Sequence, residues 1–358
     1  MKKPGEQLLE LVKTRDLAGM KKLLKAHPEA IKAPRPVGHA GGMAWREGLE
    51  LLKKHGADLN ASWRGYRPLH ALIQEEPHPC GETKPSQERL SCLRWLLQNG
   101  ADPELEAAWP PSRALLLAAF TGIQEFIPVL LDHGARVDGF AYAAFGDLKR
   151  VERCIKDDKN FVTARTRERG TTALQCCAAS RMKSKDLTAV AKLLLDKGAD
   201  PNALCEGWSH ELDVTYFAAG TGQVETFELL LQRGAKANNA LVQAAWQKNP
   251  AEFGEIALRH GADIDRAWDG DRPLLNQMIR WGQMPAVFWL LEKGAKPNNP
   301  DPNGWTAVHQ AASRGNERML NAVIEAGGDL KRKAKDGQTP MEVARTQVMI
   351  RAIKKLLK

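Results

Sequence analysis

One phrase recurs along this chain: an apolar stretch, two or three polar residues, and then Gly-Ala or Gly-Gly. The glycine of the phrase stands at positions 56, 100, 134, 198, 234, 261, 294 and 327. The steps between these glycines are 44, 34, 64, 36, 27, 33 and 33 residues, so the underlying period is 33, with one double step. A period of this size is typical of a chain built from stacked repeats, each of which contacts only its neighbours.

Each phrase has the form of a helix end. Glycine directly after an amphipathic helix takes the left-handed conformation without a steric penalty, so it stops the helix. Asp, Asn, Pro and Gly follow, as at 200–202 and 301–304, and then a second helix start with small and apolar residues at helical spacing. The pattern predicts a unit of turn, helix, turn and helix, with a short inner helix.

The segment 304–329, GWTAVHQAASRGNERMLNAVIEAGGD, resembles the ankyrin consensus GxTPLHxAAxxGxxxxVxxLLxxGAD. Related segments cover nearly the whole chain, and several positions recur together. The resemblance implies an all-α fold, namely an ankyrin-repeat solenoid of about ten or eleven stacked helix pairs with short β-hairpin or loop fingers.

We expect a single ankyrin-repeat array over residues 1–358. Its expected parts are an N-terminal cap unit at 1–27, an irregular second repeat at 28–60, central repeats at 61–330 with an inserted loop at 75–86, and a basic C-terminal cap at 331–358. The second repeat is expected to be irregular because proline and glycine at 28–43 replace its inner helix.

The net charge is +9, and this charge is concentrated at the two ends. Residues 1–26 carry seven Lys or Arg against three acids, and residues 331–358 carry nine against two. The surplus therefore falls on the expected caps, without a continuous basic groove. The longest apolar run, 114–120, is too short to cross a bilayer, no secretory signal is recognisable, and we expect a cytoplasmic monomer.

Catalytic and metal-binding patterns are absent. HELDV at 210–214 begins like a zinc-protease motif, but Val214 stands where the second histidine is needed. Glu75, Glu76, His78 and Cys80 share one polar loop, the only place to look for a nucleophile. We expect no cofactor, no metal and no enzymatic activity.

Large contact residues gather in the turn segments before inner helices. These are Trp63, Trp109, Trp208, Trp268 and Trp305, with Arg64, Tyr66, Arg67, Arg113, Arg266 and Arg272 beside them. Arg67 and Arg272 replace the threonine of the consensus, and we expect them to display their charge. Hairpin tips are exposed, so an indole there is available to a partner. The alternative for each indole is packing over the neighbouring hairpin.

The resemblance implies that a second group lines the concave surface on inner helices: Gln243, Trp246, Gln277, Arg280, Gln310 and Arg314. Arginine recognises carboxylates with paired donors and stacks on aromatic rings. The leading hypothesis is therefore a scaffold that binds another protein, through an acidic or amphipathic peptide segment. The alternatives are an enzyme or small-molecule binder that uses the groove or the 75–86 loop, and a nucleic-acid binder that uses the basic ends.

Overall fold

The computed structural model describes residues 2–74, 85–108, 111–167, 169–183, 186–207, 211–268 and 271–357. The chain divides into two compact units, Met1–Glu211 and Leu212–Lys358. Residues 75–84 of the predicted inserted loop at 75–86, with His78 and Cys80, lie outside the described residues, as do Trp109, Trp208 and His210.

The first unit consists mostly of short helices. They are α1 (Pro4–Lys13), α2 (Leu17–Ala26), the 3-10 helix η1 (Pro28–Lys32), α3 (Pro34–Gly42), α4 (Arg46–Lys54), α5 (Pro68–Gln74), α6 (Gln87–Gln98), α7 (Ala114–Thr121), α8 (Phe126–Asp132), α9 (Gly139–Phe145), α10 (Leu148–Asp157), the 3-10 helix η2 (Lys159–Val162), α11 (Ala173–Ala178) and α12 (Leu187–Asp196). Its strands are β1 (Glu106–Ala108), β2 (Pro111–Arg113) and β3 (Cys205–Glu206), and β4 (Glu211–Leu212) stands at the boundary.

The second unit repeats the same organisation. Its helices are α13 (Val214–Thr221), α14 (Val224–Gln232), α15 (Asn238–Ala245), α16 (Ala251–Arg259), α17 (Leu274–Trp281), α18 (Met284–Glu292), α19 (Ala307–Arg314), α20 (Glu317–Glu325) and α21 (Gln347–Leu356), and its hairpin strands are β5 (Ala267–Trp268) and β6 (Arg272–Pro273).

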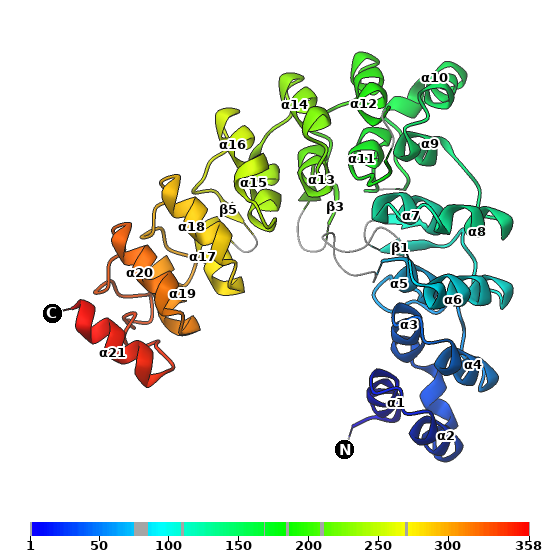
Figure 1. Cartoon of the computed structure of the whole chain (residues 1–358), viewed down its shortest axis with the longest axis horizontal. Coiled ribbons are helices and arrows are strands. Elements are labelled where there is room, and N and C mark those ends of the chain that lie inside the picture. The colour runs from blue at the N-terminus through cyan, green and yellow to red at the C-terminus, as the bar shows by residue number, and fades with distance from the viewer. Residues whose placement is uncertain are drawn as a thin grey trace. The chain divides into compact units, whose positions relative to one another are not determined.

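Helices alternate between two rows within each unit (Figure 1). In the first unit, α1, α3, α5, α7, α9 and α11 pack one against the next and form the inner row, while α2, α4, α6, α8, α10 and α12 form the outer row. In the second unit the inner row is α13, α15, α17 and α19, and the outer row is α14, α16, α18 and α20. The predicted all-α fold of stacked helix pairs is confirmed.

The recurring glycines end the outer helices as predicted. All eight have φ between +83° and +99°. Their left-handed backbone turns the chain back toward the next inner helix. Alanine at the position after seven of these glycines is small and mostly buried, as at Ala101 and Ala295, so the turn packs closely under the helix pair. The local signal was therefore sufficient to place these helix ends.

The second repeat differs from the prediction, because α3 is present where 28–43 was expected to lack an inner helix. Pro34 is the first helical residue and Pro36 lies in the first turn, where backbone N–H groups have no partner inside the helix. Gly41 lets α3 approach α5 closely, since a Cβ there would lie 2.5 Å from the carbonyl oxygen of Pro68. Both residue types are thus compatible with this helix.

The fingers are short antiparallel elements between an outer helix and the next inner helix. In the first hairpin Glu106 pairs with Arg113, and in the hairpin of the second unit Trp268 pairs with Arg272. Trp63 and Tyr66 form an isolated antiparallel bridge in an otherwise similar turn. The predicted β-hairpin fingers are therefore present in both units.

Loop side chains tie each repeat to the next. The Oδ1 atom of Asn60 accepts a hydrogen bond of 2.8 Å from the backbone N–H of Asp102, and its amide donates to the Gly100 carbonyl at 2.8 Å. Asn298 makes the same pair of bonds to Asp329 and Gly327. The Asn side chain bonds backbone groups at the end of the following outer helix, so it fixes the spacing between neighbouring repeats.

Candidate partner-binding site

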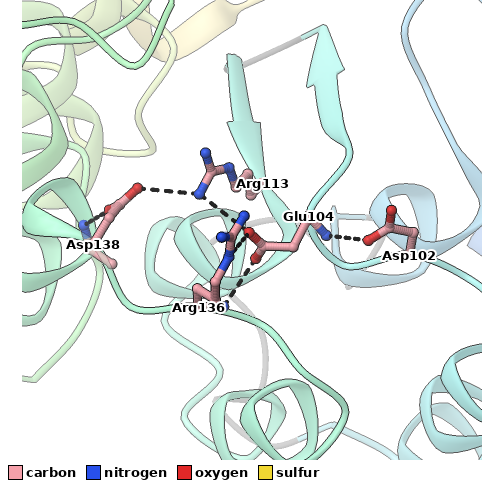
Figure 2. A network of polar contacts seen from close by, with 6 residues as sticks. Asp102, Glu104, Arg113, Arg136 and Asp138 are labelled. Atoms are coloured by element: carbon pink, nitrogen blue, oxygen red, sulfur yellow. Dashed lines mark hydrogen bonds and ion pairs between the residues drawn. The ribbon is translucent and has the colours of Figure 1, made fainter.

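Arg113, which the sequence placed on a finger, takes part in an ion-pair network (Figure 2). Its Nη1 lies 3.4 Å from Oε2 of Glu104 and 3.6 Å from Oδ2 of Asp138. Glu104 also accepts bonds from the backbone and the Nε of Arg136, at 3.0 and 2.8 Å. Burial alone would raise the pKa of Glu104, but the bonds from Arg136 and the charges of both arginines lower it. The network joins two repeats and compensates the charge of Arg113.

Trp63 lies on the first finger and is half-buried. The guanidinium carbons of Arg35 and Arg64 lie 4.5 and 5.0 Å from its ring centroid, within cation–π distance. Trp63 and Tyr66 line a cavity of about 400 Å³ with Arg35, Gly38, His39, Ala71 and Gln74. The indole of Trp63 is thus partly packed against its own unit and partly open.

Arg67 does not display its charge as expected from the sequence. Its Nε donates to the carbonyl of Glu106 at 3.2 Å, and its Nη1 donates to the carbonyl of Asn60. Arg272, in the same place in the second unit, lies 3.7 Å from the buried carboxylate of Asp301. The long side chain crosses to the neighbouring finger, so both arginines hold adjacent loops together where the consensus has a local threonine bond.

The finger tryptophans of the second unit are half-buried. Trp268 stacks on Tyr216, with ring centroids 6.5 Å apart and an interplanar angle of 7°. Trp305 stacks on His309 at 6.0 Å and 29°. Both indoles therefore pack on side chains of inner helices, and these two stacking contacts are not to a neighbouring hairpin. Arg266, directly before β5, is exposed.

The predicted residues on the inner helices separate into buried and exposed ones. Gln277 and Gln310 are buried, with 3% and 9% of their surface exposed, and Gln310 donates to Asp301 at 3.4 Å. Gln243 is half-buried against the Gly220 backbone. These glutamines pack between repeats. By contrast, Arg280, Arg314 and Trp246 are exposed.

Trp246 has a neighbour that the sequence analysis left out of the site. Trp246 at the end of α15 and Trp281 at the end of α17 contact each other edge to face, with ring centroids 6.0 Å apart. They expose 39% and 54% of their surface, the two largest exposed aromatic side chains in the described part of the chain. Trp281 precedes the glycine that ends its inner helix, and Arg314, which the sequence analysis did include, holds the same place one repeat later.

Five of the predicted residues meet in one pocket of the second unit. The pocket has a volume of about 330 Å³ and is lined by Arg272, Arg280, Asp301, Asn303, Trp305, Gln310, Ser313, Arg314 and Arg345. We call it the arginine pocket. Arg345 was missed because it stands in the basic segment 331–358, which the sequence analysis interpreted only as a solvated cap.

The described residues offer little for other chemistry. No three His, Cys, Asp or Glu side chains in these ranges are grouped so that they could hold a metal ion. Burial raises the pKa of the Cys92 and Cys177 thiols to about 12, so both are protonated at neutral pH. No helix in the described ranges combines the length and apolar composition needed to cross a lipid bilayer.

Comparisons with known proteins identify repeats of one kind. A family model described as "Ankyrin repeats (3 copies)" matches residues 275–358, and one described as "Ankyrin repeat" matches residues 169–206. The chain is 39% identical over 62 residues to ankyrin repeat-containing protein P1E11.10 of Schizosaccharomyces pombe, covering 17% of this chain and 30% of that protein. It is 37% identical over 76 residues to ankyrin repeat and SAM domain-containing protein 6 of Rattus norvegicus, covering 21% and 8%.

Both matched segments are less than two thirds of the relatives' own lengths. Among solved structures, the ankyrin repeat domain of human ASB11 aligns with a TM-score of 0.48 and 24% sequence identity, over 62% of this chain and 97% of that one.

Proposed function

This chain is an ankyrin repeat protein, and from that premise we propose that it binds a segment of another protein on the inner row of its second unit. Ankyrin repeats are generally protein–protein interaction modules. The observation that carries the proposal for this surface is the exposed pair Trp246 and Trp281, and the exposed Arg280 precedes Trp281 in α17.

Exposed indoles at neighbouring helix ends favour an apolar side chain from a partner. Tryptophan and arginine are the residues that most often dominate the energy of interfaces, especially where they cluster. Burying the exposed part of two indoles removes apolar surface from water. The adjacent arginines add attraction for carboxylates. The proposed partner segment is therefore amphipathic, with an apolar side chain over the tryptophan pair and acidic groups next to it.

Binding rather than catalysis is the proposed role of this surface. The tryptophan pair and the arginines can hold a segment, whereas none of them is a nucleophile. Burial raises the pKa of the Cys92 and Cys177 thiols, which makes these two poor nucleophiles at neutral pH. These properties support a scaffold, and a partner of defined sequence is the finding that would establish it.

The test uses the double variant Trp246→Ala/Trp281→Ala in the full chain. We expect it to weaken binding of a partner isolated with the unaltered chain by at least about tenfold, because each truncation of a central indole costs more than ~1 kcal/mol. Calorimetric titration of the purified partner measures the effect.

Phe288→Ala is the matched control, because Phe288 exposes 37% of its surface on the outer helix α18. This variant should bind as the unaltered chain does, and both variants should keep their helical circular dichroism. Equal affinity of the double variant and the control would reject the tryptophan pair as the binding surface.

A further inference from the structure

The arginine pocket carries more positive charge than its own acid compensates. Four arginines line it, and Asp301 is its one acidic lining residue. The carboxylate of Asp301 is already engaged, since its Oδ1 accepts backbone bonds of 2.9 Å from Asn303 and Trp305. Its Oδ2 faces Arg272 at 3.7 Å. One arginine is thus paired, and an excess of three positive charges remains.

Arg314 is held across the end of the neighbouring inner helix. Its Nη1 donates to the carbonyl of Arg280 at 2.7 Å. It passes over Gly282, where a Cβ would lie only 2.3 Å from Nη2 of Arg314. Gly282 also has a φ of +74°, so glycine serves both the backbone turn and this close approach. The arrangement keeps one guanidinium in a defined place at the end of α17.

Two further guanidinium groups are available to a ligand. Among the described residues, no hydrogen bond or ion pair engages the side chains of Arg280 or Arg345. Arg280 comes from α17, and Arg345 stands just before α21. Guanidinium groups from separate segments therefore line the same pocket, and the indole of Trp305 lines it as well.

We propose that the arginine pocket binds the phosphate of a phosphorylated serine or threonine side chain in the partner segment; this rests on the proposed function and specifies its partner. A phosphorylated side chain carries about −1.5 to −2 charges at pH 7 and three strong acceptor oxygens. An aspartate or glutamate carries one charge and is satisfied by one bidentate arginine. An excess of three charges and several free donors matches the phosphate monoester better.

The charge on each phosphate also favours a phosphorylated side chain over a nucleic acid as the ligand. Each phosphodiester of DNA or RNA carries a single charge, and its binding depends on many contacts along a strand. The arginine pocket is local, and the tryptophan pair lies on the same inner row of helices, with Trp281 following Arg280 at the end of α17. The partner segment should therefore carry an apolar side chain close to its phosphorylated residue.

The test measures binding of labelled random peptide pools to the full chain by fluorescence anisotropy. One pool has a fixed central phosphoserine, and the matched pools have serine or glutamate there. We expect the phosphoserine pool to bind at least about tenfold more tightly than either matched pool, as new charge-assisted hydrogen bonds predict. Inorganic phosphate should compete only at far higher concentration, since it lacks the apolar contact.

Arg280→Gln and Arg345→Gln should each reduce the preference for phosphoserine by about tenfold. Arg280→Lys, which keeps the charge but loses the paired donors, should recover only part of it. Arg259→Gln is the matched control, because it removes one exposed charge from the outer helix α16 of the same unit, and it should leave the preference intact.

Equal binding of the three pools would overturn this inference, as would a preference that survives in Arg280→Gln and Arg345→Gln. Displacement by inorganic phosphate or by a single-stranded oligonucleotide as tight as the phosphoserine pool would also overturn it. Loss of partner binding in Trp246→Ala/Trp281→Ala without any phosphoserine preference would leave the proposed function standing. Phosphoserine selectivity with an unaffected tryptophan variant would instead reject only the tryptophan surface.

Discussion

Acidification from pH 7 to pH 4 is expected to remove about 3 kcal/mol from the stability of the first unit through His70 alone. His70 lies on α5 with none of its surface exposed. Burial, followed by the positive charge of Arg67, lowers its pKa from 6.5 to about 4. Between these two pH values the imidazole of His70 is therefore neutral in the folded chain and protonated in the unfolded chain.

The sign follows from the two pKa values. Above pH 6.5 the imidazole is neutral in both states, and His70 contributes no pH dependence. Between pH 6.5 and about 4 only the unfolded state takes up the proton, so stability falls as pH falls. Below about pH 4 both states are protonated, and the loss stops growing.

Urea unfolding at a series of pH values checks this prediction. His70→Gln should lose about 3 kcal/mol less stability than the unaltered chain between pH 7 and pH 4. His27→Gln, which removes an exposed imidazole, should follow the unaltered chain. Parallel pH profiles for all three proteins would contradict the assignment to His70.

The same substitution at two glycines of α3 is expected to have opposite effects. Gly41→Ala should destabilise the first unit by about 3 kcal/mol, since its Cβ would lie 2.5 Å from the oxygen and 2.8 Å from the Cα of Pro68. These are backbone atoms, so α3 and α5 must separate. Gly38→Ala meets nothing within 4 Å and should stabilise the helix by about 0.5–1 kcal/mol.

Thermal and urea unfolding of both variants, with hydrogen exchange over α3 and α5, measure the difference. Both substitutions replace glycine by alanine within α3, so they change the helix propensity by the same amount. They differ only in how closely the new methyl group approaches α5. Changes in stability of the same sign would mean that the close approach of Gly41 to the Pro68 backbone does not determine the effect of Gly41→Ala. The comparison also tests whether α3, which the sequence analysis did not expect, is a fixed part of the fold.

Much of the candidate site was predictable from residue type and place. Arg272, Arg280, Trp305, Gln310 and Arg314 were all selected from the repeat pattern, and they line one pocket. The pattern could not say how each side chain is used. Gln310 is buried, whereas Arg280 is exposed, although the two lie on equivalent helices. They differ in their place along the helix, because Gln310 corresponds to Gln277 one repeat earlier and both glutamines are buried.

Trp281 and Arg345 mark the two ways in which the sequence analysis fell short. Trp281 lies among apolar helix positions in the sequence, but it stands one residue before the helix-ending glycine, at the exposed end of α17. Comparison with Arg314 could have found it. Arg345 had no such signal, because its approach to α17 and α19 depends on how the segment after α20 returns to the repeats.

Local chemistry settled the repeat, the helix ends and the all-α architecture of this chain, because a left-handed glycine and an amphipathic helix are recognisable within a few residues. Packing between repeats settled how the side chains of the site are used, namely which arginines are paired and which indoles are covered, and it settled that α3 forms. These outcomes depend on distances between segments some thirty or more residues apart, such as Arg280 and Arg314. No local pattern contains those distances.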